Sequence, residues 1–226
     1  MRRPKVIFLD AVGTLFGVKN SVGCAYAKIA SKYGVQADGK IIDSCFYRAF
    51  SQSPPLAFSE ADEVEKKEYN WWKNIAFNTF KMAESLQQFS NFDLFFEELY
   101  QYFKTAEPWE VYEDVVPSLN RWKNQGISLG IISNFDSRIF PVLESLKLRD
   151  YFDSITISSL TGYAKPHPKI FLTALAKNNC KPEEAWHIGD SEKEDYQAAK
   201  EVGIQSFWLN RPIYTLKHLP DPLQCP

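Results

Sequence analysis

The sequence predicts an α/β fold: a Rossmann-like parallel sheet whose first strand is followed by an inserted all-helical domain. Two observations lead to this prediction. Short apolar runs alternate with amphipathic helical patterns over most of the chain, and one long stretch near the N-terminus carries helical patterns only. With 226 residues and 45% hydrophobic content, the chain can bury a large core together with such an insertion.

The apolar runs are typical of strands that are buried on both faces of a parallel sheet. The first run, KVIFLD at 5–10, begins with β-branched residues and ends on Asp10. Similar short runs follow at 127–133, 155–158, 185–188 and 205–209. The helical patterns that separate these later runs cover 136–147, 168–177 and 193–202.

The stretch from 18 to 107 differs from the rest of the chain. It contains no run typical of a buried strand, and its helical patterns at 22–33, 40–50, 60–84 and 92–104 are dense in aromatic residues. We expect these aromatic side chains to form the core of a helical cap domain at 18–107. Residues 1–17 and 108–226 then form the Rossmann-like core domain.

Composition limits the possible partners and location. A net charge of −2 gives no electrostatic footprint for nucleic acid or an anionic membrane. No apolar stretch approaches the roughly 18 residues that are needed to span a bilayer. The four cysteines, Cys24, Cys45, Cys180 and Cys225, are far apart, so we expect reduced thiols and a cytoplasmic protein. The choice between a monomer and a homodimer stays open.

Polar residues suited to one site follow four of the predicted strands. In an open parallel sheet, ligands bind outside the carboxyl ends of the strands, so these residues are expected to meet. Each group alone would be explained as a helix cap or a turn. The four groups are Asp10 with Gly13 and Thr14, Ser133 with Asn134, Lys165 in GYAKPHPKIF, and Asp190 with Asp195 in GDSEKED.

This order of motifs resembles the haloacid dehalogenase (HAD) superfamily of hydrolases. DAVGT at 10–14 stands for the first motif, normally Asp-x-Asp-x-Thr, and Ser133, Lys165 and GDSEKED stand for the other three. The resemblance covers the whole chain, because these enzymes commonly insert a helical cap after the first motif. The WW pair at 71–72, ISNFD and GDxxxxDYQ are similar to the branch called HAD-like hydrolase domain-containing protein 3.

The resemblance implies a Mg²⁺-dependent phosphatase that acts on a small phosphorylated molecule. Asp10 is the implied nucleophile, which forms an aspartyl-phosphate. The implied Mg²⁺ site consists of Asp10, the backbone carbonyl of Val12 and Asp190, with Asp195 as its further acidic residue. Asp195 orients either Lys165 or a metal-bound water.

The remaining motif residues are implied to contact the phosphoryl group. Thr14, Ser133 and nearby backbone N–H groups, including that of Gly13, bind its oxygens. Lys165 neutralises the charge that develops during transfer. Asn134 is a further substrate-binding candidate, for which a capping role is the alternative.

Val12 departs from the motif. Superfamily phosphatases usually carry a second aspartate at this position, which acts as general acid and base, and valine can do neither. Since such catalysis typically contributes about 10²–10⁴ in rate, we expect depressed turnover and a preference for phosphates with good leaving groups.

Two alternatives follow from Val12. The 2-haloacid dehalogenases of the same superfamily also lack the second aspartate, but they use no metal, and the best candidate to clamp their carboxylate substrate here is Arg48. The other alternative is a catalytically impaired binding or interaction protein. Among the remaining polar residues, we interpret His187 as a hydrogen-bonded core histidine and Arg211 as the anchor of a loop.

Overall fold

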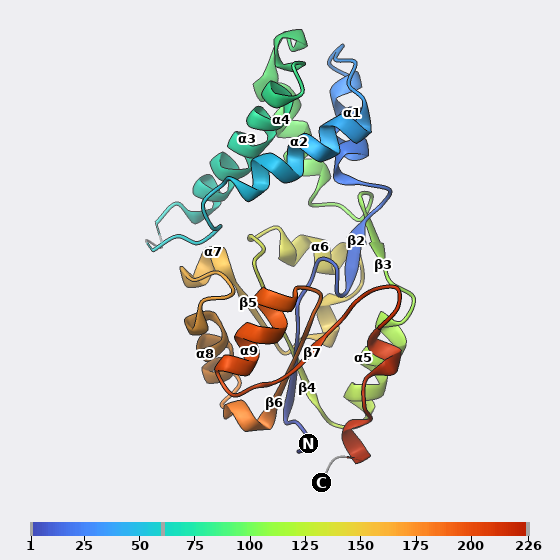
Figure 1. Cartoon of the computed structure of the whole chain (residues 1–226), viewed down its shortest axis with the longest axis vertical. Helices are drawn as coiled ribbons and strands as arrows, with labels where there is room; N and C mark the ends of the chain where they lie inside the picture. Colours follow the sequence, from blue (N-terminus) through green and yellow to red (C-terminus); the bar gives the residue numbers. More distant parts are fainter. Residues whose placement is uncertain (1, 60–61, 225–226) are drawn as a thin grey trace. The chain divides into compact units, whose positions relative to one another are not determined.

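The computed structural model describes residues 2–59 and 62–224 (Figure 1). The chain divides into two compact units. The core unit consists of Met1–Gly17, Leu56–Ala61 and Val111–Pro226, and the helical unit consists of Val18–Pro55 and Asp62–Glu110. The short segment Leu56–Ala61, within the region predicted as an insertion, groups with the core unit.

The core unit contains a five-stranded parallel sheet within the described residues, with strand order β5-β4-β1-β6-β7. The α/β fold class that the sequence predicts is therefore confirmed. All five strands coincide with the predicted apolar runs: β1 (Val6–Leu9), β4 (Ser128–Ser133), β5 (Ser154–Ile157), β6 (Ala185–Gly189) and β7 (Gln205–Trp208).

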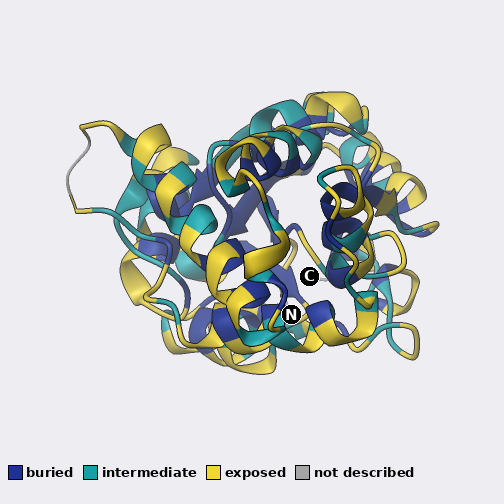
Figure 2. Ribbon diagram, turned by 90° about the horizontal axis from the view of Figure 1, so that it is seen from above, coloured by how far each residue is buried: buried dark blue, intermediate teal, exposed yellow. Residues whose placement is uncertain are grey.

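Helices cover the sheet and complete the core of this unit. Helices α8 (Pro168–Lys177) and α9 (Ala198–Glu201) pack near β4, β5 and β7, and α5 (Val115–Asn124) packs against β4. Phe8 and Ile132 of the sheet share one buried cluster with Ile170 and Phe171 of α8. All residues of β1 and β6 are buried, and buried residues are dark blue in Figure 2, where the helices also carry exposed residues in yellow.

Several elements differ from the prediction. The expected helix at 193–202 is a π-helical segment, η4 (Glu192–Gln197), followed by α9. Its turn is wider because the Tyr196 N–H donates to the Ser191 carbonyl, five residues back, at 3.2 Å. Helices α5, α6 (Ile139–Ser145) and α7 (Ser158–Thr161) complete the unit, and α5 and α7 were not predicted.

Two short strands, also not predicted, connect the units along the chain. Strands β2 (Phe16–Val18) and β3 (Trp109–Val111) pair in a two-stranded sheet, and the boundary between the units falls within each of them. Short helical turns occur at η1 (Leu86–Gln88), η2 (Arg149–Tyr151), η3 (Pro182–Glu184), η5 (Leu216–His218) and η6 (Pro222–Gln224).

The helical unit contains the four predicted helices: α1 (Val22–Ser31), α2 (Gly39–Ser51), α3 (Val64–Met82) and α4 (Phe92–Tyr102). The start of the predicted 60–84 helix lies outside the described residues. Side-chain oxygens of Ser21, Asp38 and Asn91 cap the starts of α1, α2 and α4.

Aromatic rings fill the interior of the helical unit, as predicted. Phe80 is fully buried, and its ring lies 5.0 Å from that of Phe89 and 5.1 Å from that of Phe95. Tyr26 of α1 stacks on Phe80 of α3, with the two ring centroids 6.3 Å apart. In the described part of the chain, no helix has the length and apolar character that a bilayer crossing requires.

Candidate active site

Three adjacent strands bring the predicted motifs to one edge of the sheet. The central strand β1 lies between β4 and β6, and Leu9 pairs with Ile131 on one side and Ile188 on the other. The Asp10 N–H donates to the Ile188 carbonyl at 2.9 Å, so the chain leaves β1 beside the end of β6. Ser133 at the end of β4 and Asp190 after β6 therefore flank Asp10.

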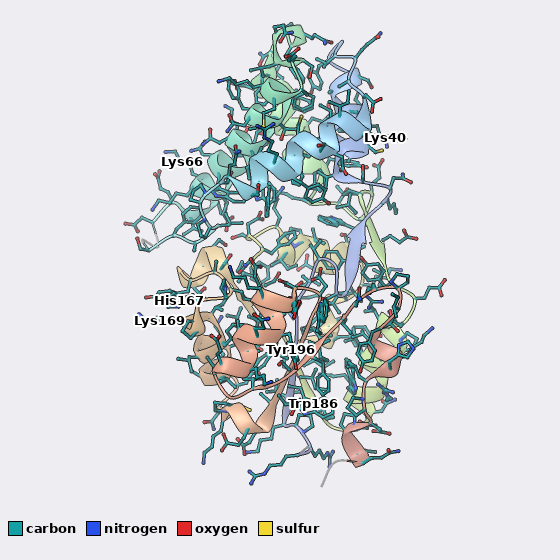
Figure 3. All side chains as sticks on the ribbon, in the orientation of Figure 1. Lys40, Lys66, His167, Lys169, Trp186 and Tyr196 are labelled. Carbon is teal, nitrogen blue, oxygen red and sulfur yellow. The ribbon has the colours of Figure 1, made fainter. Side chains whose placement is uncertain are left out.

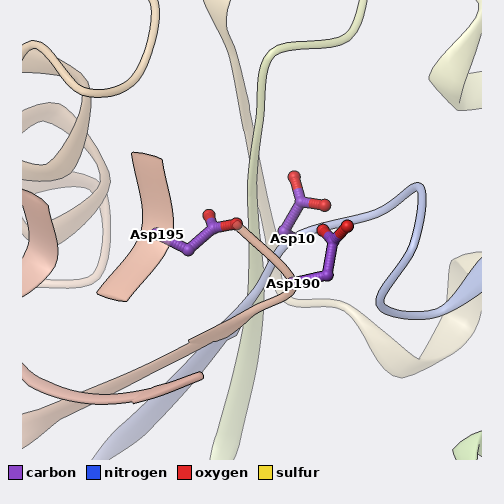
Figure 4. A group of neighbouring side chains, drawn as sticks. All are labelled: Asp10, Asp190 and Asp195. Atoms are coloured by element: carbon purple, nitrogen blue, oxygen red, sulfur yellow. The ribbon is translucent and has the colours of Figure 1, made fainter. Parts of the chain in front are cut away.

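The carboxylates of Asp10, Asp190 and Asp195 converge at this edge. Each offers an oxygen atom, and these oxygens lie within 4.8 Å of one another (Figure 4). Gly13 makes room for this group, because a Cβ atom at its position would collide with the Asp190 carboxylate. Its φ of +90° also lies in the region that favours glycine.

Lys165 joins two of the three carboxylates. Its Nζ donates to Asp10 Oδ1 at 2.7 Å and to Asp195 Oδ1 at 2.5 Å, and its side chain is only 2% exposed. The Asn134 side chain fixes the Lys165 backbone, since Oδ1 accepts from the Lys165 N–H at 2.7 Å and Nδ2 donates to its carbonyl at 2.9 Å. The lysine is thus held at both its backbone and its ammonium group.

Asp195 is held from three directions. Besides Lys165, its Oδ1 bonds with His187 Nε2 at 2.9 Å, and its Oδ2 accepts from the Ser191 N–H at 3.1 Å. Gly189 leaves space for it, because a Cβ atom there would collide with the Asp195 carboxylate. His187 is a fully buried, hydrogen-bonded histidine, as predicted, but its partner in the site was not predicted.

Burial and mutual repulsion set the electrostatics of the three carboxylates. Burial raises the pKa of Asp10, against the opposing effect of Lys165. Burial, followed by repulsion from Asp10 and Asp195, raises the pKa of Asp190 to about 7. For Asp195, burial also raises the pKa, but Lys165 and His187 outweigh it and hold the pKa below its usual range.

Lys165 keeps its charge in this environment. Burial lowers the pKa of its ammonium group, but Asp10 and Asp195 outweigh burial and hold the pKa above its usual value. Lys165 is therefore a charged partner for two of the three carboxylates, Asp10 and Asp195. The three converging carboxyl groups form a set of oxygen donors that fits a Mg²⁺ ion, which prefers carboxylates and waters as ligands.

The predicted phosphoryl-binding residues surround Asp10 in different ways. The Thr14 Oγ1 atom is buried and has no hydrogen-bond partner among the described residues, so it can donate to a bound oxygen. Ser133 is buried at the end of β4, and its hydroxyl lowers the pKa of Asp10. The Gly13 N–H donates to the Phe16 carbonyl at 2.8 Å. Asn134 also donates to Glu194 Oε2 at 3.1 Å, so its amide is engaged by the protein.

Two side chains next to the site donate hydrogen bonds to the backbone carbonyls of site residues. Arg211 Nη2 donates to the Thr14 carbonyl at 2.8 Å and Nη1 to Asp114 Oδ1 at 2.8 Å, which confirms Arg211 as a loop anchor. Trp208 Nε1 donates to the Asp190 carbonyl at 2.9 Å, a contact that was not predicted. His167 caps the start of α8, where Figure 3 shows it near Lys169.

Comparison with known proteins agrees with this arrangement. A family model described as haloacid dehalogenase-like hydrolase matches residues 4–203. The chain belongs to this family. The HAD-like hydrolase domain-containing protein 3 of Bos taurus is 31% identical to it over 211 residues, which cover 92% of this chain and 82% of the bovine protein. The predicted superfamily and branch are thus confirmed.

Solved HAD structures share the fold. A HAD phosphatase from Thermococcus onnurineus superposes with a TM-score of 0.66 at 25% identity and covers 98% of both chains. The L-2-haloacid dehalogenase from Xanthobacter autotrophicus superposes with the same TM-score of 0.66 at 17% identity, covering 92% of this chain and 78% of that one. The fold of this HAD-like hydrolase is therefore common to both activities, and the site must distinguish them.

Proposed function

We propose that this HAD-like hydrolase is a Mg²⁺-dependent phosphatase that acts through an aspartyl-phosphate on Asp10. The observation that supports this most directly is the convergence of Asp10, Asp190 and Asp195, with oxygens within 4.8 Å of one another. Asp10 and Asp190 would hold the ion together with the backbone carbonyl of Val12. When bound, Mg²⁺ supplies the positive charge that lets a carboxylate approach a phosphoryl group.

The chain's own residues have separate roles in this proposal. Asp10 attacks phosphorus, and Lys165, which is already bonded to Asp10, neutralises charge on the transferring group. Thr14 and Ser133 bind the phosphoryl oxygens, whereas the Gly13 N–H already donates to the Phe16 carbonyl. Asp195 holds Lys165 in place through the contact between its Oδ1 and Nζ.

The proposed substrates are small molecules with a good leaving group, such as aryl or acyl phosphates. Val12 supports this choice, because its side chain cannot protonate a departing alkoxide. We expect a higher kcat/KM for p-nitrophenyl phosphate than for glycerol 3-phosphate, and we expect Val12→Asp to raise turnover of the alkyl ester. Equal alkyl-ester rates for the wild type and Val12→Asp would contradict this role for position 12.

Phosphate release from p-nitrophenyl phosphate, with and without Mg²⁺, tests the proposed function. The Asp10→Asn variant should lose more than about 10³-fold in rate, because the amide cannot act as the nucleophile. Glu192→Gln is a matched control, since Glu192 is an exposed acidic residue two positions from Asp190. Metal-independent turnover, or turnover that survives Asp10→Asn, would contradict the proposal.

A 2-haloacid dehalogenase is the second candidate, and the family fold is compatible with it. Three converging carboxylates would repel a carboxylate substrate in the absence of a cation, and the lysine that contacts Asp10 is already shared with Asp195. Arg48, the candidate clamp, is an exposed residue of α2 in the helical unit. Halide release from 2-chloropropionate without added metal would favour this alternative.

We also propose a cellular location and an oligomeric state. Cys24, Cys45 and Cys180 are free thiols, as expected for a cytoplasmic protein. We propose that the protein acts there as a monomer or a homodimer. Light scattering after size-exclusion chromatography distinguishes these two states.

A further inference from the structure

The ionisable side chains around Asp10 already have partners. Lys165 donates to Asp10 and Asp195, and Asp195 also bonds with His187 Nε2 at 2.9 Å. Glu194 accepts from Asn134 at 3.1 Å. Asp190, the remaining carboxylate, is the proposed ligand of the cation. Lys165, Asp195 and Glu194 are thus each engaged by a neighbouring side chain, and Asp190 is assigned to the cation.

The loop after Asp10 supplies no base for an incoming water. Val12 lies two residues beyond Asp10, and its apolar side chain is 36% exposed. Its neighbours Ala11 and Gly13 also lack ionisable groups, and the Thr14 hydroxyl is not basic near neutral pH. The segment that directly follows Asp10, residues 11–14, therefore contains no side chain that can accept the proton of an attacking water.

This absence affects the two chemical steps unequally. In the first step, an Asp10 carboxylate oxygen bonds to phosphorus, and the bond from phosphorus to the leaving oxygen breaks. An aryl oxide or a carboxylate departs with the electron pair as a stable anion and needs no proton. A good leaving group therefore makes the first step independent of a general acid.

The second step always involves proton transfer. The oxygen of water bonds to phosphorus, the bond between phosphorus and Asp10 breaks, and its electron pair returns to the carboxylate. The attacking water must lose a proton, which passes to solvent or phosphate when no protein base is present. This requirement is the same for every substrate, because the leaving group has already departed.

We infer that hydrolysis of the Asp10 phosphoenzyme limits turnover, and that the phosphorylated protein accumulates when an activated phosphate is in excess. The inference rests on the proposed function. It adds that phosphorylation of Asp10 is faster than hydrolysis of the resulting aspartyl-phosphate. The steady-state rate should then be the same for all activated phosphates, because hydrolysis of the same phosphoenzyme sets it.

Rapid-mixing kinetics with the full chain and Mg²⁺ test this inference. With p-nitrophenyl phosphate, we expect a burst of nitrophenolate approaching one equivalent per protein, followed by a slow linear phase. 2,4-Dinitrophenyl phosphate should give a faster burst but the same linear rate. Linear rates that follow the leaving group, without a burst, would overturn the inference and leave the proposed function standing.

Two substitutions at the exposed position 12 test the cause. Val12→Asp should raise the linear rate by at least about tenfold and shrink the burst, because it introduces a base. Val12→Asn matches aspartate in size but cannot accept the proton, so its burst should persist even where its overall rate changes. A burst that Val12→Asp leaves intact would refute the role of position 12, and the absence of any phosphate release would overturn both proposals.

Discussion

The two units of the molecule contain ion pairs in different surroundings. In the helical unit, ion pairs such as Lys28–Glu107 and Lys32–Glu98 lie at the surface, and aromatic rings fill the interior. In the core unit, Lys165, Asp10 and Asp195 are almost fully buried at the ends of the strands. Burying charged groups costs folding free energy, and in the core unit these groups lie where the proposed phosphoryl chemistry would use them.

The difference has a consequence for mutation. In the helical unit, stability depends on the shape of the rings, and loss of a ring leaves a cavity. In the core unit, charge balance around one lysine adds a second contribution, since loss of that lysine leaves two buried carboxylates without a cation. Matched substitutions in the two units therefore distinguish these sources of stability.

Lys165→Met should have the largest effect. It removes the ammonium group from both Asp10 and Asp195, so we expect a loss of about 3–5 kcal/mol in the free energy of unfolding together with loss of phosphatase activity. Urea denaturation in EDTA measures the first effect. Lys169→Met is the control, because Lys169 is exposed and its contact with Tyr163 should contribute less than about 1 kcal/mol. Equal stabilities for the two variants would contradict the charge-balance explanation.

Phe80→Ala should have a comparable but purely structural effect. Phe80 is fully buried among aromatic rings, so its removal should cost about 3–5 kcal/mol of unfolding free energy. Phe77→Ala provides the comparison, since Phe77 is 41% exposed and should cost far less. Thermal or urea unfolding measures both. A Phe77 variant as destabilised as the Phe80 variant would show that burial in this unit does not determine the cost.

Addition of Mg²⁺ should have the smallest effect on stability. Binding to the native state at about 100 times the dissociation constant adds about 2.7 kcal/mol, which raises the melting temperature. Asp190→Asn should lose most of this increase, because it removes one of the two proposed carboxylate ligands. Calorimetric melting with Mg²⁺ and with EDTA measures the difference. An unchanged Mg²⁺ response in the variant would exclude Asp190 as a ligand.

The sheet could be predicted because its signal is local. Each strand is a short apolar run, so Phe8 and Ile132 mark the core without any knowledge of the fold. Helix α5 was missed because Pro117 lies inside its first turn and obscures the pattern. The π-helical turn was missed because it depends on hydrogen bonds between Ser191 and Tyr196 and not on hydrophobic spacing.

The candidate site could be predicted only as a set of strand ends. The motifs indicated which residues meet, but not the bonds between them. The contact of His187 with Asp195 depends on the space beside Gly189, and the clamp of Asn134 on Lys165 joins segments 31 residues apart. Such contacts follow from the topology of the folded chain, so no spacing in the sequence reveals them.

Identification of the phosphorylated residue tests the central claim most directly. The protein is incubated with Mg²⁺ and p-nitrophenyl phosphate, quenched in acid and reduced with borohydride, which converts an aspartyl-phosphate to homoserine. Peptide mass spectrometry should then find homoserine at position 10 and nowhere else, and none without Mg²⁺. Aspartate unchanged at position 10 while phosphate is released, or a modification at another residue, would contradict Asp10 as the nucleophile.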